Sequence, residues 1–174
     1  MHLPRTLERG SLDWLNGLDE DDCAMELRAC CAAGAWVRGM VAARPFSSPD
    51  DVWETSDGLV SALDDEGLGE ALAAHARIGE RRSGESREDS WSRAEQAGAL
   101  GAAADLRELL EQGNRAYEER FGHVFLIRAA GRSAQEMYDA QRSRLGNDEV
   151  TERAVVLHEL AEIVRLRLEG LVGA

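Results

Sequence analysis

The fold is decided by a stretch near the C-terminus, Val156-Leu-His-Glu-Leu-Ala-Glu-Ile-Val-Arg-Leu-Arg-Leu168. At about 100° per residue, its apolar side chains gather on one face of a helix that we expect over residues 149–171. That face comprises Leu157, Leu160, Ala161, Val164, Leu168 and Leu171, with Val156 and Ile163 extending it to one side. The stretch therefore predicts a long helix with one buried face.

The two arginines of this stretch lie in different surroundings. Arg167 projects within the extended apolar side, with Ile163 one turn before it. Arg165 projects from the other edge, where Glu162 and Glu169 can pair with it. We expect Arg165 to be solvated and Arg167 to lie against apolar surface, which is costly unless an anion or hydrogen bonds meet its charge. A guanidinium that reaches solvent along its apolar stem is the alternative interpretation.

The rest of the composition also favours helices. Of the 174 residues, 44% are hydrophobic but only 5% aromatic, and three are proline, so Leu, Ala, Val and Ile must form most of the core. Alternating runs rich in β-branched residues do not occur. We expect an all-α fold, a single-domain compact bundle of about eight helices over residues 11–174, with one short extended segment near residues 123–128. Residues 1–10 are expected to form a flexible N-terminal arm.

Cap residues and glycines suggest where the helices begin and end. Asp19 can cap a helix that Gly34 ends. Asp64 or Asp65 can open a short helix that ends with His75. These positions place His75 at the end of a helix rather than inside one.

An apolar run without helical spacing follows a long helix that we expect over about residues 103–120. The run is Phe121-Gly-His-Val-Phe-Leu-Ile127, and it predicts an extended segment. An isolated extended segment has free backbone N–H and C=O groups, so a ligand is a reasonable partner for them.

Charge and cysteine usage limit the functions of the chain. The formal charge of -13 argues against nucleic-acid binding, which needs a basic surface. All 20 basic residues are arginine, so chemistry that requires a lysine amine is excluded. Cys23, Cys30 and Cys31 fit small buried side chains in a reducing compartment, and they complete no zinc spacing. Without a membrane-spanning stretch or a signal-peptide pattern, we expect a cytoplasmic protein that binds neither a membrane nor a metal.

Two neighbouring segments carry groups suited to proton transfer, His75-Ala-Arg-Ile-Gly79 and Ser92-Arg-Ala-Glu-Gln-Ala-Gly98. An imidazole titrates near neutral pH, and Glu95 and Gln96 supply a carboxylate and an amide. Taken singly, the histidine would more often be a helix cap or surface group, and the other two solvated helix residues. Together they favour acid–base chemistry on a polar small molecule. The polar loop between them, residues 79–91, is either a lid or a plain connection.

With further motifs in the same order, these segments resemble the family of 2-oxo-4-hydroxy-4-carboxy-5-ureidoimidazoline (OHCU) decarboxylases. The resemblance covers about residues 12–172. Its other motifs are Leu27-Arg-Ala-Cys-Cys31 with Trp36, Ala43-Arg-Pro-Phe46, Arg120-Phe-Gly-His-Val-Phe-Leu-Ile127 and Arg165-Leu-Arg-Leu168. It implies an all-α carboxy-lyase, homodimeric and without cofactors, that converts the small molecule OHCU to (S)-allantoin and CO2 in urate (purine) catabolism.

The resemblance also implies roles for individual residues. The catalytic set would be His75, Glu95 and Arg167. The substrate-binding set would be Ser92, Gln96, Ala76 and the backbone of Phe125, Leu126 and Ile127. The family usually has proline directly after the histidine, where this chain has Ala76. Alanine frees a backbone torsion and adds an N–H donor, but it removes no reactive group.

Two other interpretations stay open. The chain can be a non-catalytic acidic helical module that docks to a partner protein, or a paralogue that acts on a related ureido or imidazoline compound. The intact set of His75, Glu95, Gln96 and Arg167 argues against the module, which would have no need to keep these groups together.

Overall fold

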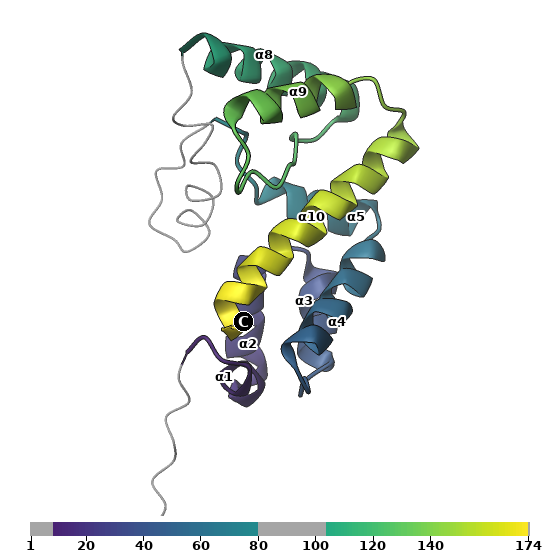
Figure 1. Cartoon of the computed structure of the whole chain (residues 1–174). Coiled ribbons are helices and arrows are strands. Elements are labelled where there is room, and N and C mark those ends of the chain that lie inside the picture. Colours follow the sequence, from purple (N-terminus) through teal and green to yellow (C-terminus); the bar gives the residue numbers. More distant parts are fainter. Residues whose placement is uncertain (1–8, 80–103, 174) are drawn as a thin grey trace, which may run out of the picture.

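The computed structural model describes residues 9–79 and 104–173, and this part of the chain is helical (Figure 1). Its helices are α1 (Leu12–Gly17), α2 (Glu20–Cys30), α3 (Gly34–Ala42), α4 (Pro49–Ser61), α5 (Asp65–Ala73), α8 (Ala104–Phe121), α9 (Ala134–Arg144) and α10 (Glu149–Val172). No strand occurs among the described residues, so the all-α prediction is confirmed. Within the same ranges, none of the helices has both the length and the apolar composition that a bilayer requires.

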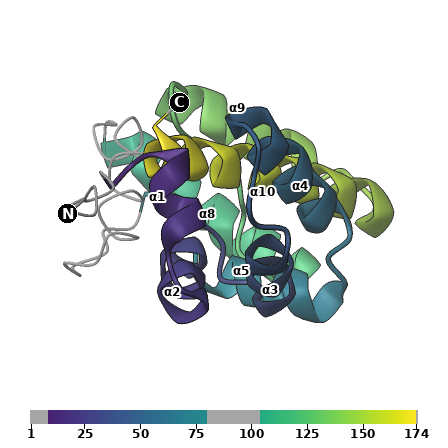
Figure 2. The ribbon, with the colours of Figure 1, turned by 90° about the horizontal axis from the view of Figure 1, so that it is seen from below.

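Helix α10 is the longest described helix and connects the two ends of the molecule (Figure 1). The carboxylate of Asp148 caps it by accepting a hydrogen bond from the Thr151 N–H. Its apolar face is buried as the sequence predicts, with Leu160, Val164 and Leu168 fully inaccessible to solvent. This face packs against α4, α1 and α2, and Figure 2 shows α1 beside the C-terminal part of α10.

The buried apolar residues form two clusters. The larger one, the main core, joins α1–α5 to α10 and includes Trp36 and Leu168. The smaller one, the second core, joins α8 and α9 and includes Tyr117 and Met137. Their separation leaves a boundary between the α8–α9 pair and the rest of the molecule (Figure 1). Polar groups from both sides meet along this boundary.

The extended segment of residues 124–129 lies at this boundary. Helix α8 ends at Phe121, and Gly122 adopts a left-handed φ of 75°, which turns the chain out of the helix. After the turn, Val124 and Leu126 contact the main core, whereas Phe125 and Ile127 belong to the second core. Alternate side chains of an extended chain point to opposite sides, so the segment holds the two cores together. The predicted extended run is confirmed from Val124 onward, whereas Phe121 still belongs to α8, and the run forms no strand among the described residues.

Two of the expected helix ends were wrong. Gly34 does not end α2. That helix ends at Cys30 because Cys31 has an extended backbone, and Gly34 instead begins α3 and donates its N–H to a carboxylate oxygen of Glu70 at 2.7 Å. Helix α5 starts after the Asp64 cap as expected but ends at Ala73, so His75 lies just beyond the helix.

Candidate active site

His75 is held between α5 and α8. Its backbone N–H donates to the Leu72 carbonyl at 3.0 Å in the last turn of α5, and the residue is half-buried. Two residues later, Arg77 pairs with Glu118 on α8, its Nη2 lying 2.8 Å from the carboxylate. The carbonyl of Ile78 accepts a hydrogen bond from the Asn114 side chain at 2.9 Å. The chain around the histidine, including the half-buried Ala76, is therefore fixed to both helices.

The Arg77 guanidinium holds the pKa of the Glu118 carboxyl below its usual value, because the hydrogen bonds between them favour the charged carboxylate. Both side chains are partly exposed to solvent. An ion pair this exposed contributes little to stability, but it connects the chain after His75 to α8.

Arg167 is buried and Arg165 is exposed, which confirms the distinction drawn from the helical face. Arg167 is 8% exposed, and its Nη1 donates to the Cys30 carbonyl at 3.3 Å. Arg165 lies over the Trp53 ring and approaches Glu169 at 3.8 Å. A guanidinium has five N–H donors, so a buried one at this place is suited to bind an anion or a carbonyl-rich ligand.

The loop after α2 connects the surroundings of Arg167 with α5. Arg167 contacts this loop at Cys30, and Glu70 of α5 contacts it at Gly34. Between these contacts, burial raises the pKa of the Cys31 thiol to about 11, while Arg167 and Glu70 act on that pKa in opposite directions. The arginine and the end of α5 therefore lie on either side of one short loop, and His75 follows Glu70 by five residues.

The backbone of Phe125, Leu126 and Ile127 carries polar groups that have no partner among the described residues. These residues are 1%, 4% and 3% exposed. Among the hydrogen bonds of residues 9–79 and 104–173, none involves their N–H groups or the carbonyls of Phe125 and Ile127. Buried backbone groups are nearly always paired, so a polar partner is expected at this segment.

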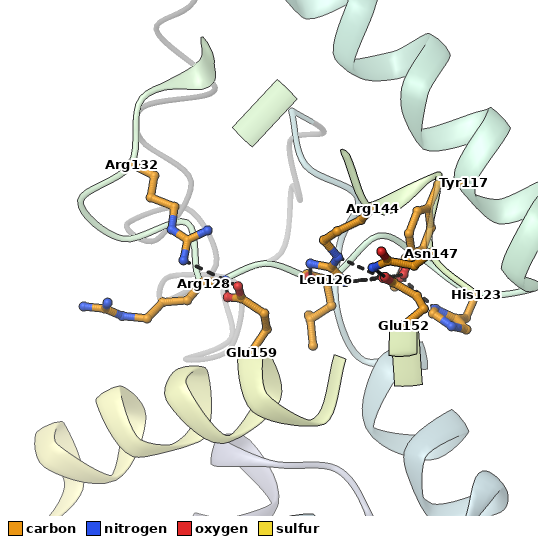
Figure 3. Close-up of polar contacts among 10 residues, drawn as sticks. Tyr117, His123, Leu126, Arg128, Arg132, Arg144, Asn147, Glu152 and Glu159 are labelled. Carbon is orange, nitrogen blue, oxygen red and sulfur yellow. Dashed lines mark hydrogen bonds and ion pairs between the residues drawn. The ribbon is translucent and has the colours of Figure 1, made fainter. Parts of the chain in front are cut away.

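Two charged side chains fix this segment in place (Figure 3). Arg144 donates from Nη1 to the Leu126 carbonyl at 2.7 Å. At the other end, a carboxylate oxygen of Glu159 accepts the Arg128 N–H at 2.7 Å. The unpaired groups of Ile127 lie between these two contacts.

Arg144 belongs to a buried polar network that the sequence did not predict. Its guanidinium contacts Glu152 at 2.6 Å and lies over the Phe125 ring at 4.6 Å. Glu152 also accepts hydrogen bonds from the hydroxyl of Tyr117 and the side-chain amide of Asn147. Burial, and then the hydrogen bond to Glu152, raise the pKa of Tyr117 well above its usual value. The partners come from α8, α9 and α10, so no spacing within one helix could have indicated the network.

A cleft of about 510 Å³ lies between the first turns of α10, helix α5 and the turn after α8. Among the described residues, its lining includes His123, Glu152 and Arg153 but neither His75 nor Arg167. Within the described ranges, no three side chains of His, Cys, Asp or Glu gather closely enough to hold a metal ion.

Three of the predicted site residues, Ser92, Glu95 and Gln96, lie outside the described residues, as does most of the 79–91 loop. Convergence of Glu95 with His75 and Arg167 on one cavity therefore stays a prediction. The described residues place His75 just beyond α5, Arg167 beside the loop after α2, and the backbone of residues 125–127 between the two cores.

Comparison with known proteins gives a consistent result. The sequence model of the OHCU decarboxylase family matches residues 16–169. The uric acid degradation bifunctional protein PucL of Bacillus subtilis is 29% identical over 165 residues, which are 93% of this chain and 33% of PucL. The OHCU decarboxylase of Haloferax volcanii is 29% identical over 161 residues, which are 91% of this chain and 94% of that protein. The chain spans about a third to a half of the length of the bifunctional relatives it matches.

The fold is also that of a solved structure, the crystal structure of an OHCU decarboxylase in the presence of (S)-allantoin. The two share a TM-score of 0.74 at 23% sequence identity, over 86% of this chain and 98% of the other. At that identity the likeness shows a common fold.

Proposed function

The chain belongs to the OHCU decarboxylase family, and we propose that it converts OHCU to (S)-allantoin and CO2 in urate catabolism, without a cofactor. Among the described residues, the observation that supports this most is the buried segment of Phe125, Leu126 and Ile127, where the three N–H groups and two of the three carbonyls lack partners. A ring rich in carbonyl, N–H and ureido groups is the kind of ligand that would pair them. A helical docking module would have no use for unpaired polar groups in its interior.

The reaction requires the protein mainly to orient the substrate and to transfer protons. The substrate carries its carboxylate on a carbon next to a hydroxyl group and an imine-like ring. When the bond to CO2 breaks, its electron pair forms a double bond to the neighbouring ureido-bearing carbon, and the imine-like nitrogen takes up a proton. The hydroxyl then loses its proton to become a carbonyl, and one proton must reach one face of the ureido-bearing carbon. The protein has to orient the carboxylate, stabilise charge as it moves into the ring and select the face.

The residues divide these tasks. His75 hydrogen-bonds the hydroxyl or carboxylate and transfers the proton, because an imidazole is the side chain best suited to take up and release a proton near neutral pH. Glu95 fixes the tautomer of His75 or binds the ureido group. Arg167, Ser92 and Gln96 hold the polar rim of the ring together with the backbone of residues 125–127, and the Ala76 N–H adds a donor beside the histidine.

We also propose a cellular compartment, an oligomeric state and the classes of partner that the protein does not bind. The three free, buried cysteines suit the reducing cytoplasm. The charge of -13 does not suit binding to nucleic acid, and we propose a homodimer that associates with neither nucleic acid nor membrane. Light scattering on a sizing column tests the dimer, and a monomer at micromolar concentration would reject it.

Circular dichroism tests the activity. OHCU is generated from urate with the upstream enzymes, the protein is added, and the signal of (S)-allantoin is followed. The wild type should accelerate its formation, and His75→Ala and Glu95→Ala should each abolish the acceleration while helicity stays unchanged. His158→Ala is the matched control, because His158 is an exposed histidine on α10 and should retain full activity.

Three results would count against the proposal. A wild type that is no faster than spontaneous decay would reject the activity. Wild-type rates in His75→Ala would reject its catalytic role. Turnover of a related ureido compound, with none of OHCU, would favour the paralogue.

A further inference from the structure

Glu159 is a buried carboxylate that binds a backbone N–H with one of its oxygens. The residue is 8% exposed, and one of its oxygens accepts the Arg128 N–H at 2.7 Å. Its other oxygen lies 3.4 Å from the Arg132 guanidinium, which is the longer of the two contacts (Figure 3). A buried carboxylate is costly, and hydrogen bonds from a backbone amide and an arginine offset that cost. The shorter contact holds the main chain rather than a side chain.

The contact joins two parts of the proposed site. Arg128 directly follows Phe125, Leu126 and Ile127, whose N–H groups, like the carbonyls of Phe125 and Ile127, have no partners among the described residues. Glu159 lies on α10, the helix that also carries Arg167 eight residues later, or about 12 Å along the axis. A rigid helix therefore sets the distance between the unpaired backbone and the buried guanidinium. Without Glu159, the Arg144 contact at Leu126 is the hydrogen bond to this segment that remains among the described residues.

Glu162 provides a natural comparison. It lies three residues further along α10 and approaches the side chain of the same Arg128, with 4.0 Å between Nη1 and the carboxylate. Its side chain is 42% exposed, and it makes no described contact with the backbone of the segment. Removing Glu162 deletes the same charge from the same face but leaves the Arg128 N–H paired.

We propose that Glu159 is a positioning residue, which holds the segment of residues 125–128 so that its backbone groups can bind the ring of the substrate. The inference rests on the proposed function. Glu159 does not touch the substrate. It acts through the Arg128 N–H, and its role belongs to binding rather than to proton transfer.

Steady-state kinetics on three variants tests the inference. Glu159→Ala should raise KM about tenfold, equivalent to about 1.4 kcal/mol of binding, and leave kcat within about threefold, because the contact supports the ground state and the transition state alike. Glu159→Gln keeps an oxygen acceptor and should restore KM to within about twofold of the wild type. Glu162→Ala should leave both constants unchanged. A general loss of stability would not produce this split between KM and kcat or its rescue by glutamine.

Hydrogen exchange gives a readout that does not depend on activity. In Glu159→Ala the amides of residues 126–128 should exchange at least tenfold faster, and in Glu162→Ala they should exchange at the wild-type rate. Should Glu159→Ala fail to fold, Glu159→Asp replaces it, because the shorter side chain keeps the charge but withdraws from the Arg128 N–H. That variant should raise KM several-fold.

The outcomes separate the two proposals. A wild type without activity would refute the proposed function and this inference together. An active wild type with unchanged KM in Glu159→Ala and Glu159→Asp would overturn the inference alone, as would an equal rise of KM in Glu162→Ala.

Discussion

Substitution of Arg144 by methionine should destabilise the protein more than any surface change. Arg144 and Glu152 are 7% and 1% exposed, and two guanidinium nitrogens, Nε and Nη2, contact the same carboxylate oxygen at 2.9 and 2.6 Å. Methionine fills much of the same volume but leaves Glu152 as a buried charge with fewer partners and leaves the Leu126 carbonyl unpaired. Breaking a buried pair in this way costs about 3–5 kcal/mol. For a chain of this length that corresponds to a fall in Tm of about 6–20 °C.

Urea unfolding followed by circular dichroism measures the effect, with Arg165→Met as the matched control. Arg165 has an exposed partner, Glu169, four residues away at 3.8 Å, and such pairs contribute about 0.3–0.5 kcal/mol. The double variant Arg144→Met with Glu152→Leu should recover part of the loss, because it removes both charges but deprives the Tyr117 hydroxyl and the Leu126 carbonyl of these partners. A loss below about 1 kcal/mol in Arg144→Met, or a double variant no better than the single one, would refute the reasoning.

Three further predictions concern stability. Gly113→Ala should lower the free energy of unfolding by about 1–3 kcal/mol, because its Cβ would collide with the Gln141 side chain. Gly170→Ala on α10 is the control: its Cβ meets nothing, so this variant should raise the free energy of unfolding by up to about 1 kcal/mol. Urea unfolding in which both variants change the free energy in the same direction would contradict this. Ser133→Ala removes the capping box of α9 and should lower the free energy of unfolding by about 1 kcal/mol in the same assay. An unchanged free energy would argue that the cap does not stabilise the helix. Burial raises the pKa of Cys31 from 9.0 to about 11, so the folded state keeps a proton that the unfolded state loses, and stability should fall as pH rises through that interval. Cys31→Ala should flatten this decline, and an unchanged slope would exclude the thiol as its cause.

Much of the fold could be predicted because it depends on local patterns. The apolar spacing of Leu160, Val164 and Leu168 gave the buried face of α10, and the same face separated Arg167 from Arg165. The run that includes Phe125 broke the helical period and indicated the extended segment. These features follow from periodicity and from caps, which neighbouring residues determine.

The unpredicted features depend on contacts between distant residues. Gly34 resembles a helix end, but its N–H binds Glu70, which is 36 residues away, and it starts a helix instead. Glu152 and Arg144 look like ordinary solvated helix residues in the sequence, and only the docking of three helices buries them. Glu159 likewise gave no sign of a role, because its partner is a backbone amide on a segment 31 residues earlier.

A crystal structure of the protein with (S)-allantoin bound would test the central claim most directly. We expect the ligand beside His75, with its polar atoms paired to the backbone of Phe125–Ile127 and to Arg167, and with Glu95 within hydrogen-bond distance of the ligand or the imidazole. Allantoin bound instead in the cleft beside His123 and Arg153, or out of reach of both His75 and the backbone at residues 125–127, would contradict the account.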